Sequence, residues 1–224
     1  MSNAIEVKNL SKTVPDAGDT LRILDDISFA VESADSLAIT GASGSGKSTL
    51  LGLLAGLDVP SHGDVFLTGQ SLFAMDEERR ALYRARHVGF VFQSFYLLPH
   101  LNVLENVILP LELQGAPHAD ARARAMIEQV GLSPRVRHTP KTLSGGEQQR
   151  VALARAFVAE PAIIFADEPT GSLDFTTGSR IIDLMFELQM KTRATLVLVT
   201  HDPALAGRCG RQLSLAEGRL RWQN

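Results

Sequence analysis

The chain has 224 residues, of which 45% are hydrophobic and 21% charged, with a net charge of −3 and one cysteine. This length and composition are typical of a globular protein with one good core or two closely joined lobes. The slightly acidic charge argues against general nucleic-acid binding, which usually needs a basic face. A single cysteine, Cys209, excludes a disulfide framework and a cysteine-rich metal site.

The beginning of the chain, MSNAIEVKNL, lacks the basic and apolar regions of a signal peptide. No apolar run approaches the roughly 18 residues of a membrane span. We therefore expect a cytoplasmic protein, unless a partner holds it at a membrane. A local basic cluster lies next to acidic residues and favours a solvated helix face; it contains Arg79, Arg80, Arg84 and Arg86.

Short apolar strands alternate with helical stretches, which predicts an α/β fold with a largely parallel sheet. Residues 4–31 alternate in polarity and predict an antiparallel hairpin at the sheet edge. A strand over 36–40 is followed by a glycine loop and a helix over 48–57, and then by a strand over 87–92.

The middle of the chain differs because prolines interrupt it and a helical stretch occupies 119–130. It predicts a helical lobe over 94–155, inserted between two parts of an α/β core formed by 1–93 and 156–224. In the second part, apolar runs at 162–166 and 194–200 predict parallel strands buried on both faces. The last residues, 211–222, again predict an antiparallel hairpin.

A phosphate-binding loop is predicted directly between the strand 36–40 and the following helix. The stretch GASGSGKST fits the pattern G-x-x-x-x-G-K-[ST]; its members are Gly41, Ala42, Ser43, Gly44, Ser45, Gly46, Lys47, Ser48 and Thr49. The glycines let backbone N–H groups surround phosphate oxygens, and the helix N-terminus adds positive partial charge. Lys47 would reach the β- and γ-phosphates and Ser48 would bind Mg²⁺. The loop predicts a nucleoside triphosphate site.

Polar residues follow three of the predicted strands. Asp167 and Glu168 end the apolar run AIIFA, where Asp167 can support Mg²⁺ through a water and Glu168 can act as general base. Gln93 and His201 follow the strands 87–92 and 194–200. Carboxyl ends of strands are where α/β proteins bind ligands. On this pattern alone, solvated acids and structural polar residues remain the alternative.

The stretch TLSGGEQQRVALARAF, residues 142–157, predicts a helix with an unusual beginning. Ser144 and Glu147 have the spacing of a capping box, yet Gly145 and Gly146 occupy the first turn. Glycine costs roughly 0.8–1.0 kcal/mol relative to alanine in a helix interior. Two explanations stay open: an ordinary cap with tolerated glycines, or a backbone that a ligand approaches closely at an anion-attracting helix end.

Taken together, these motifs resemble the ATP-binding subunit of an ABC transporter. The loop 41–49 resembles the Walker A motif, Gln93 the Q-loop, LSGGE the signature, IIFADE the Walker B motif, GSLD at 171–174 the D-loop, and His201 the switch histidine. The resemblance implies an ABC ATPase fold with a phosphate-loop (RecA-like) core. It also implies ATP and Mg²⁺ as ligands, and the lobe 94–155 then ends in the signature helix.

The resemblance further implies roles for individual residues. Glu168, His201 and Gln93 would be catalytic, and Mg²⁺ would be held by Ser48, Gln93 and Asp167. A homodimer would form on ATP binding, with the signature residues completing the partner's nucleotide site together with the D-loop; these residues are Ser144, Gly145, Gly146, Glu147 and Asp174.

The stretch 87–113 resembles the lipoprotein-release and macrolide-export type, which includes LolD, MacB and FtsE, and especially its YbbA-like members. This implies a place on the inner face of the cytoplasmic membrane, beside an integral permease with a large extracytoplasmic domain. The cargo would be lipids, lipoproteins, peptides or hydrophobic compounds, or the pair would transmit force across the membrane. One departure is Val14, which occupies the position of the family's usual adenine-stacking aromatic residue.

Three other classes fit less well. A soluble ABC-type ATPase acting on nucleic acid or the ribosome usually carries coiled-coil inserts or fused cassettes, and this chain has neither. A binding module without hydrolysis would not need Glu168 and His201. A phosphate-loop kinase would not need the signature helix.

Overall fold

The computed structural model describes residues 3–16 and 19–223. They form two compact units, each described here by itself. The first unit comprises residues 1–84 and 195–224, and the second comprises residues 85–194. Among the described residues, no helix is long and apolar enough to cross a bilayer.

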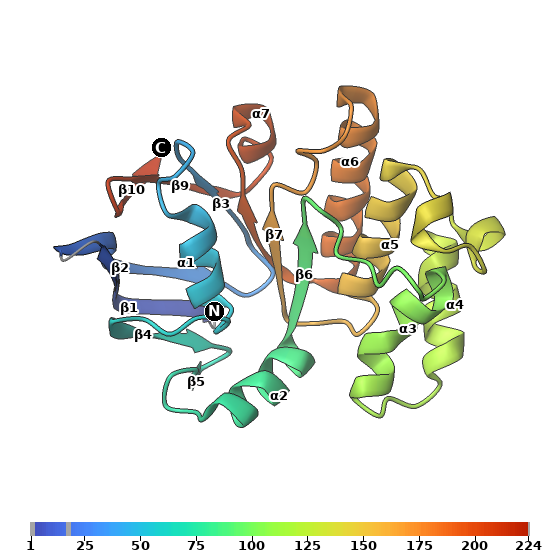
Figure 1. Ribbon diagram of the computed structural model, residues 1–224, viewed down its shortest axis with the longest axis horizontal. Coiled ribbons are helices and arrows are strands. Elements are labelled where there is room, and N and C mark those ends of the chain that lie inside the picture. The colour runs from blue at the N-terminus through green and yellow to red at the C-terminus, as the bar shows by residue number, and fades with distance from the viewer. Residues whose placement is uncertain (1–2, 17–18, 224) are drawn as a thin grey trace. The chain divides into compact units, whose positions relative to one another are not determined.

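The first unit contains an antiparallel sheet in the order β2-β1-β4-β5 (Figure 1). Its strands are β1 (Asn3–Asp16), β2 (Asp19–Glu32), β4 (His62–Leu67) and β5 (Gln70–Ser71). Ile5, Val7 and Leu24 are almost fully buried, as expected where alternate side chains of a strand face the core. The antiparallel pairing predicted at the start of the chain is therefore confirmed as β1 and β2, but its place at the edge of the parallel sheet is wrong, because both strands pair within a separate sheet.

The remaining strands of the first unit are parallel except at their edge. Strand β3 (Ser36–Thr40) pairs in parallel with β8 (Thr195–Val199) and β9 (Arg211–Ala216). Strand β10 (Arg219–Gln223) pairs antiparallel with β9, which confirms the predicted C-terminal hairpin. Helix α1 (Lys47–Leu54) follows β3, and the short helix α7 (Pro203–Ala206) follows β8.

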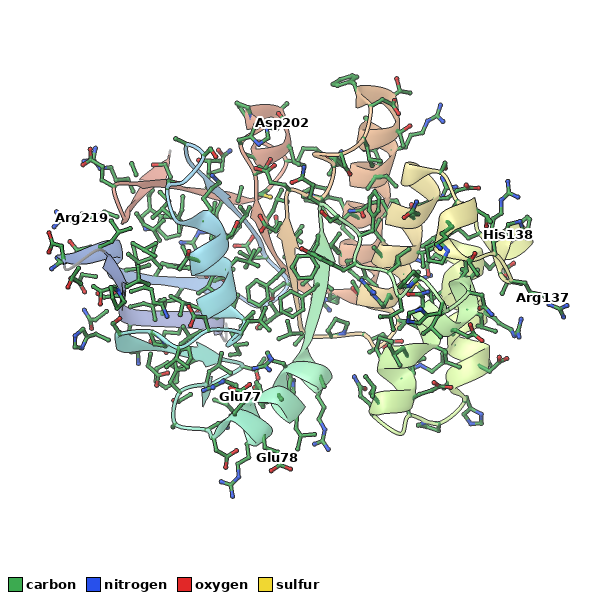
Figure 2. All side chains as sticks on the ribbon, viewed as in Figure 1. Glu77, Glu78, Arg137, His138, Asp202 and Arg219 are labelled. Carbon is green, nitrogen blue, oxygen red and sulfur yellow. The ribbon has the colours of Figure 1, made fainter. Side chains whose placement is uncertain are left out.

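Helix α2 (Glu77–His87) carries the basic cluster, and the expectation of a solvated face is wrong for two of its arginines. Arg80 is only 7% exposed; it contacts Glu77 and lies over the Phe73 ring, 5.6 Å from its centroid. Arg84 donates to the Gly56 carbonyl at 2.6 Å. The labelled Glu77 marks the more exposed face of α2 (Figure 2). The two guanidinium groups thus hold residues 77–84 of α2 to the rest of the first unit.

The second unit combines a parallel strand pair with helices (Figure 1). Strands β6 (Val88–Phe92) and β7 (Ile163–Asp167) pair in parallel. The helices are α3 (Val103–Leu113), α4 (Ala119–Gln129), α5 (Gly145–Phe157) and α6 (Phe175–Thr192). Helix α5 packs against β6 and against the other three helices, so it lies at the centre of this unit. The boundaries of a helical lobe over 94–155 stay a prediction.

Candidate nucleotide-binding site

The phosphate loop connects β3 to α1 in the first unit, as its sequence predicts. Gly46 precedes α1 with φ of 96°, a left-handed conformation that favours glycine. Gly41 is required for a different reason: a Cβ there would lie 2.4 Å from the Leu215 carbonyl oxygen and 2.8 Å from Ser45 Oγ. Larger residues at these positions would force the loop to open.

The loop presents several groups that suit a bound phosphate. Lys47 is 9% exposed, and its Nζ donates to the Gly41 and Ala42 carbonyls at 2.9 and 2.8 Å. An ammonium group held in this way has a further donor to offer. The buried Ser45 Oγ has no hydrogen-bond partner among the described residues, and no side chain caps the start of α1. An anion would satisfy these groups.

A cavity of about 440 Å³ lies beside the loop within the first unit. Its walls come from β2 at residues 21–23, from the phosphate loop at 42–45, and from the β9–β10 turn at 215–218. Val14 pairs with Leu21, one of the lining residues, in the β1–β2 register. Val14, which stands where the family usually has an aromatic residue, is therefore next to a cavity that adjoins the phosphate loop.

His201 follows β8 at the strand's carboxyl end, as predicted, and is exposed. The next residue, Asp202, begins α7 (Figure 2). Its carboxylate accepts from the backbone N–H groups of Ala204 and Leu205 at 2.8 and 3.4 Å. This cap fixes the turn that carries His201.

In the second unit, the register of the parallel pair puts Gln93 and Glu168 at neighbouring strand ends. Phe92 pairs with Asp167, so Gln93 and Glu168 are the next residues at adjacent carboxyl ends of β6 and β7. The loop after Glu168 also contacts Gln93, because Ser172 Oγ donates to the Gln93 carbonyl at 3.0 Å. Glu168 has φ of 45°, a conformation that residues other than glycine adopt only when their surroundings hold it.

The predicted capping box is present at the start of α5. The Ser144 side chain accepts from the Glu147 N–H at 3.3 Å, and Glu147 Oε2 accepts from the Ser144 N–H at 2.8 Å. Glu147 Oε1 also accepts from Arg135 Nε at 2.9 Å. The Ser144 backbone N–H, with Arg135, lowers the pKa of Glu147 below its usual range. The Ser144 hydroxyl accepts from the Glu147 N–H and also hydrogen-bonds to the Glu147 carboxylate, so the two residues hold each other through backbone and side chain.

The D-loop residue Asp174 caps the neighbouring helix α6 by accepting from the Thr177 N–H at 3.0 Å. That backbone hydrogen bond is the main cause of a lowered pKa at Asp174. The start of α5 packs directly on this region, since a Cβ on Gly146 would lie 2.5 Å from Thr177 Cγ2. The signature and D-loop residues therefore form one continuous part of the second unit.

Two polar residues of α5 escaped the sequence-based assignment of the site. Gln149 is fully buried, and Arg155 donates to the Phe95 and Tyr96 carbonyls at 2.8 and 2.6 Å. Gln149 is spaced four and seven residues before Leu153 and Ala156 on the core face of the helix. A polar residue on the apolar face of a predicted helix is the sequence signal that could have identified Gln149.

Comparison with known proteins decides the family. The model of a family described as ABC transporter matches residues 24–171. The chain belongs to the ABC transporter ATP-binding proteins. It is 54% identical to YbbA of Escherichia coli K12, an ABC transporter ATP-binding protein, over 97% of this chain and 96% of that protein. It is 45% identical to the lipoprotein-releasing system ATP-binding protein LolD of Alcanivorax borkumensis, over 97% and 96% of the two chains.

Solved structures agree with this assignment. A bacterial ABC transporter cassette described as dimeric has a TM-score of 0.90 and 37% identity to this chain, covering 98% of each. The same cassette in a post-hydrolysis state, bound to ADP and Pi, has a TM-score of 0.90 and 36% identity, again covering 98% of each. The predicted ABC ATPase fold, with an antiparallel sheet beside a parallel one, is thereby confirmed for this cassette.

Proposed function

We propose that this cassette hydrolyses MgATP as a homodimer and drives a membrane permease. The observation that carries the proposal is the paired ending of β6 and β7, after which Gln93 and Glu168 are the next residues of the two strands. A carboxylate beside an amide at the carboxyl ends of parallel strands can orient and deprotonate a water. The relation to a cassette solved with ADP and Pi supports hydrolysis as the outcome.

In this proposal the phosphate loop binds the triphosphate. The backbone N–H groups of residues 41–49 and the start of α1 would hold phosphate oxygens, and Lys47 would neutralise charge on the β- and γ-phosphates. Hydroxyl, amide and carboxylate oxygens are ligands that Mg²⁺ accepts, so Ser48, Gln93 and Asp167 fit the ion's preference. Bound Mg²⁺ would supply charge neutralisation at the phosphates.

Glu168 would accept the proton of the attacking water, and His201 would contact the γ-phosphate. As the water oxygen forms its bond to the γ-phosphorus, the bond to the bridging oxygen breaks and ADP leaves with that electron pair.

The second copy would complete each site. The N-terminus of α5 would offer its backbone N–H groups to the γ-phosphate bound by the partner subunit, assisted by the Ser144 hydroxyl. Gly145 would keep a side chain out of that approach, Gly146 would offer its backbone N–H, and Asp174 would lie at the same interface. The dimeric state of the solved relative supports this arrangement.

We place the dimer on the inner face of the cytoplasmic membrane, bound to a permease with a large extracytoplasmic domain. Similarity to YbbA and LolD supports a permease of that type, and a cargo of lipids, lipoproteins, peptides or other hydrophobic compounds, or mechanical work across the membrane. The segment 94–101 would contact the permease, since Tyr96 and Leu98 are exposed apolar residues next to Gln93.

Replacing the proposed general base tests the assignment. Glu168→Gln should still bind MgATP but lose turnover by about 10²-fold or more, and it should accumulate as an ATP-bound dimer. Phosphate release and light scattering would measure both effects. Glu187→Gln, an exposed carboxylate of α6, is the matched control and should keep wild-type turnover. Near wild-type turnover in Glu168→Gln would remove Glu168 from its role.

A further inference from the structure

Gln149 lies at the centre of the second unit, with its carboxamide between the two strand ends that carry the catalytic residues. Its side chain is fully buried. Nε2 donates to the Pro169 carbonyl at 2.5 Å and, more weakly, to the Phe92 carbonyl at 3.4 Å. One carboxamide therefore contacts the residue just after Glu168 and the residue just before Gln93.

The bond to Pro169 bears on the strained conformation of Glu168. A left-handed conformation at a residue with a side chain persists only when neighbouring contacts hold it. One such contact is local, from the Gly171 N–H to the Glu168 carbonyl at 3.0 Å. The proline ring already fixes φ of Pro169, so holding its carbonyl restrains the remaining backbone rotation of that residue. Gln149 thus stabilises the turn after Glu168 through the Pro169 carbonyl.

Stability alone does not explain a glutamine at this position. Its Oε1 is buried and has no hydrogen-bond partner among the described residues. An unmet buried acceptor is destabilising, and the same face of α5 is otherwise occupied by buried apolar residues such as Leu153 and Ala156. An apolar side chain of similar length would lack the two N–H donors of the carboxamide, so these donors explain why a glutamine occupies the position.

We propose that Gln149 is a positioning residue, which holds the peptide groups beside Glu168 and Gln93 in the geometry needed for hydrolysis. It would act through backbone carbonyls and not touch the nucleotide. Because Gln149 belongs to the helix whose first turn carries the signature, it also ties that helix to the proposed base. This inference rests on the role proposed above for Glu168.

The test compares two buried glutamines of the second unit. Gln149→Met keeps the length of the side chain and removes both donors. Gln189→Met is the matched control, because Gln189 is 7% exposed on α6 and donates to the Ala194 carbonyl at 2.9 Å, away from both strand ends. Steady-state kcat and KM for MgATP, the dissociation constant for ATP and the melting temperature would be measured on the full chain, with Glu168→Gln alongside.

We expect kcat of Gln149→Met to fall about tenfold to a hundredfold, since a displacement of about 1 Å in a catalytic group costs about that much. KM, ATP binding and melting temperature should change no more than in Gln189→Met, which should keep its kcat within about twofold. If Gln149→Met does not fold, Gln149→Leu, of similar volume, takes its place.

Two results would overturn the inference about Gln149 without contradicting the proposed role of Glu168 as general base. One is an unchanged kcat in Gln149→Met when Glu168→Gln has lost turnover. The other is an equal loss of kcat in both methionine variants, which would indicate general destabilisation. A Glu168→Gln protein that still turns over ATP would instead contradict the proposed function itself.

Discussion

The glycine at position 146 allows a sharp test of why the signature helix begins without side chains. A Cβ there would lie 2.5 Å from Thr177 Cγ2, whereas carbon atoms in contact are usually about 3.5–4.0 Å apart. Thr177 cannot simply rotate away, because its hydroxyl and its N–H both hydrogen-bond to Asp174. The structure therefore explains the missing side chain by packing of α5 on α6 within one chain.

The expected magnitude follows from two opposing effects. Overpacking of this kind costs about 1–3 kcal/mol, while alanine in place of glycine returns up to about 1 kcal/mol of helix propensity. Gly146→Ala should therefore lower the free energy of unfolding by up to about 2 kcal/mol. Thr177→Ser removes only the offending methyl group and keeps the hydroxyl, at a cost of about 0.8 kcal/mol by itself.

The double variant Gly146→Ala, Thr177→Ser should be about as stable as Thr177→Ser alone, and it should regain the ATP turnover that Gly146→Ala loses. Urea unfolding and phosphate release measure the two properties in all four proteins, so that the coupling free energy is obtained directly. A double variant as unstable as Gly146→Ala would refute the packing argument. Restored stability without restored turnover would mean that the methyl group obstructs a nucleotide or partner outside the chain.

Three further predictions concern other parts of the cassette. The cap lowers the pKa of Glu147 from 4.5, so the charged carboxylate stabilises the fold above that pH. The melting temperature of the wild type should exceed that of Glu147→Gln there, and the difference should vanish as the pH falls through the lowered pKa. A difference that does not depend on pH would refute this. Val14→Tyr should tighten ATP binding about fivefold or more through stacking, but leave inorganic triphosphate binding unchanged; equal effects on both would mean that Val14 does not face adenine. Tyr96→Glu should abolish co-purification with the permease from detergent-solubilised membranes and leave ATP binding intact. Leu113→Glu, which is also exposed in the second unit, is the control and should affect neither property. Loss of both assembly and ATP binding in Tyr96→Glu would indicate misfolding.

Local patterns carried most of the successful sequence predictions. The phosphate loop and the capping box of α5 depend on residues within a few positions of one another, so their spacing in the sequence already specifies their geometry. Strands β3, β7 and β8 are apolar runs that reflect burial on both faces. In each case the stabilising contacts are those that the sequence pattern itself encodes.

What the sequence did not predict depends on distant partners. Arg80 was expected on a solvated face, but its side chain is buried, lies over the Phe73 ring and contacts the exposed Glu77 carboxylate. The clash that requires glycine at 146 comes from Thr177, on a different helix. The left-handed φ of Glu168 likewise depends on contacts with its surroundings, since a residue with a Cβ adopts it only at a cost.

Helix α5 explains how one element can serve several functional segments of the second unit. Its capped first turn carries the signature glycines, Gln149 in the second turn contacts both strand ends, and Arg155 holds the carbonyls of residues 95 and 96. With a rise of about 1.5 Å per residue, these points span roughly 16 Å of rigid backbone. A displacement at the nucleotide end of α5 must then be shared with the segment that we assign to the permease. No flexible linker within α5 separates the two, so nucleotide binding and permease contact can be coupled by the position of a single helix.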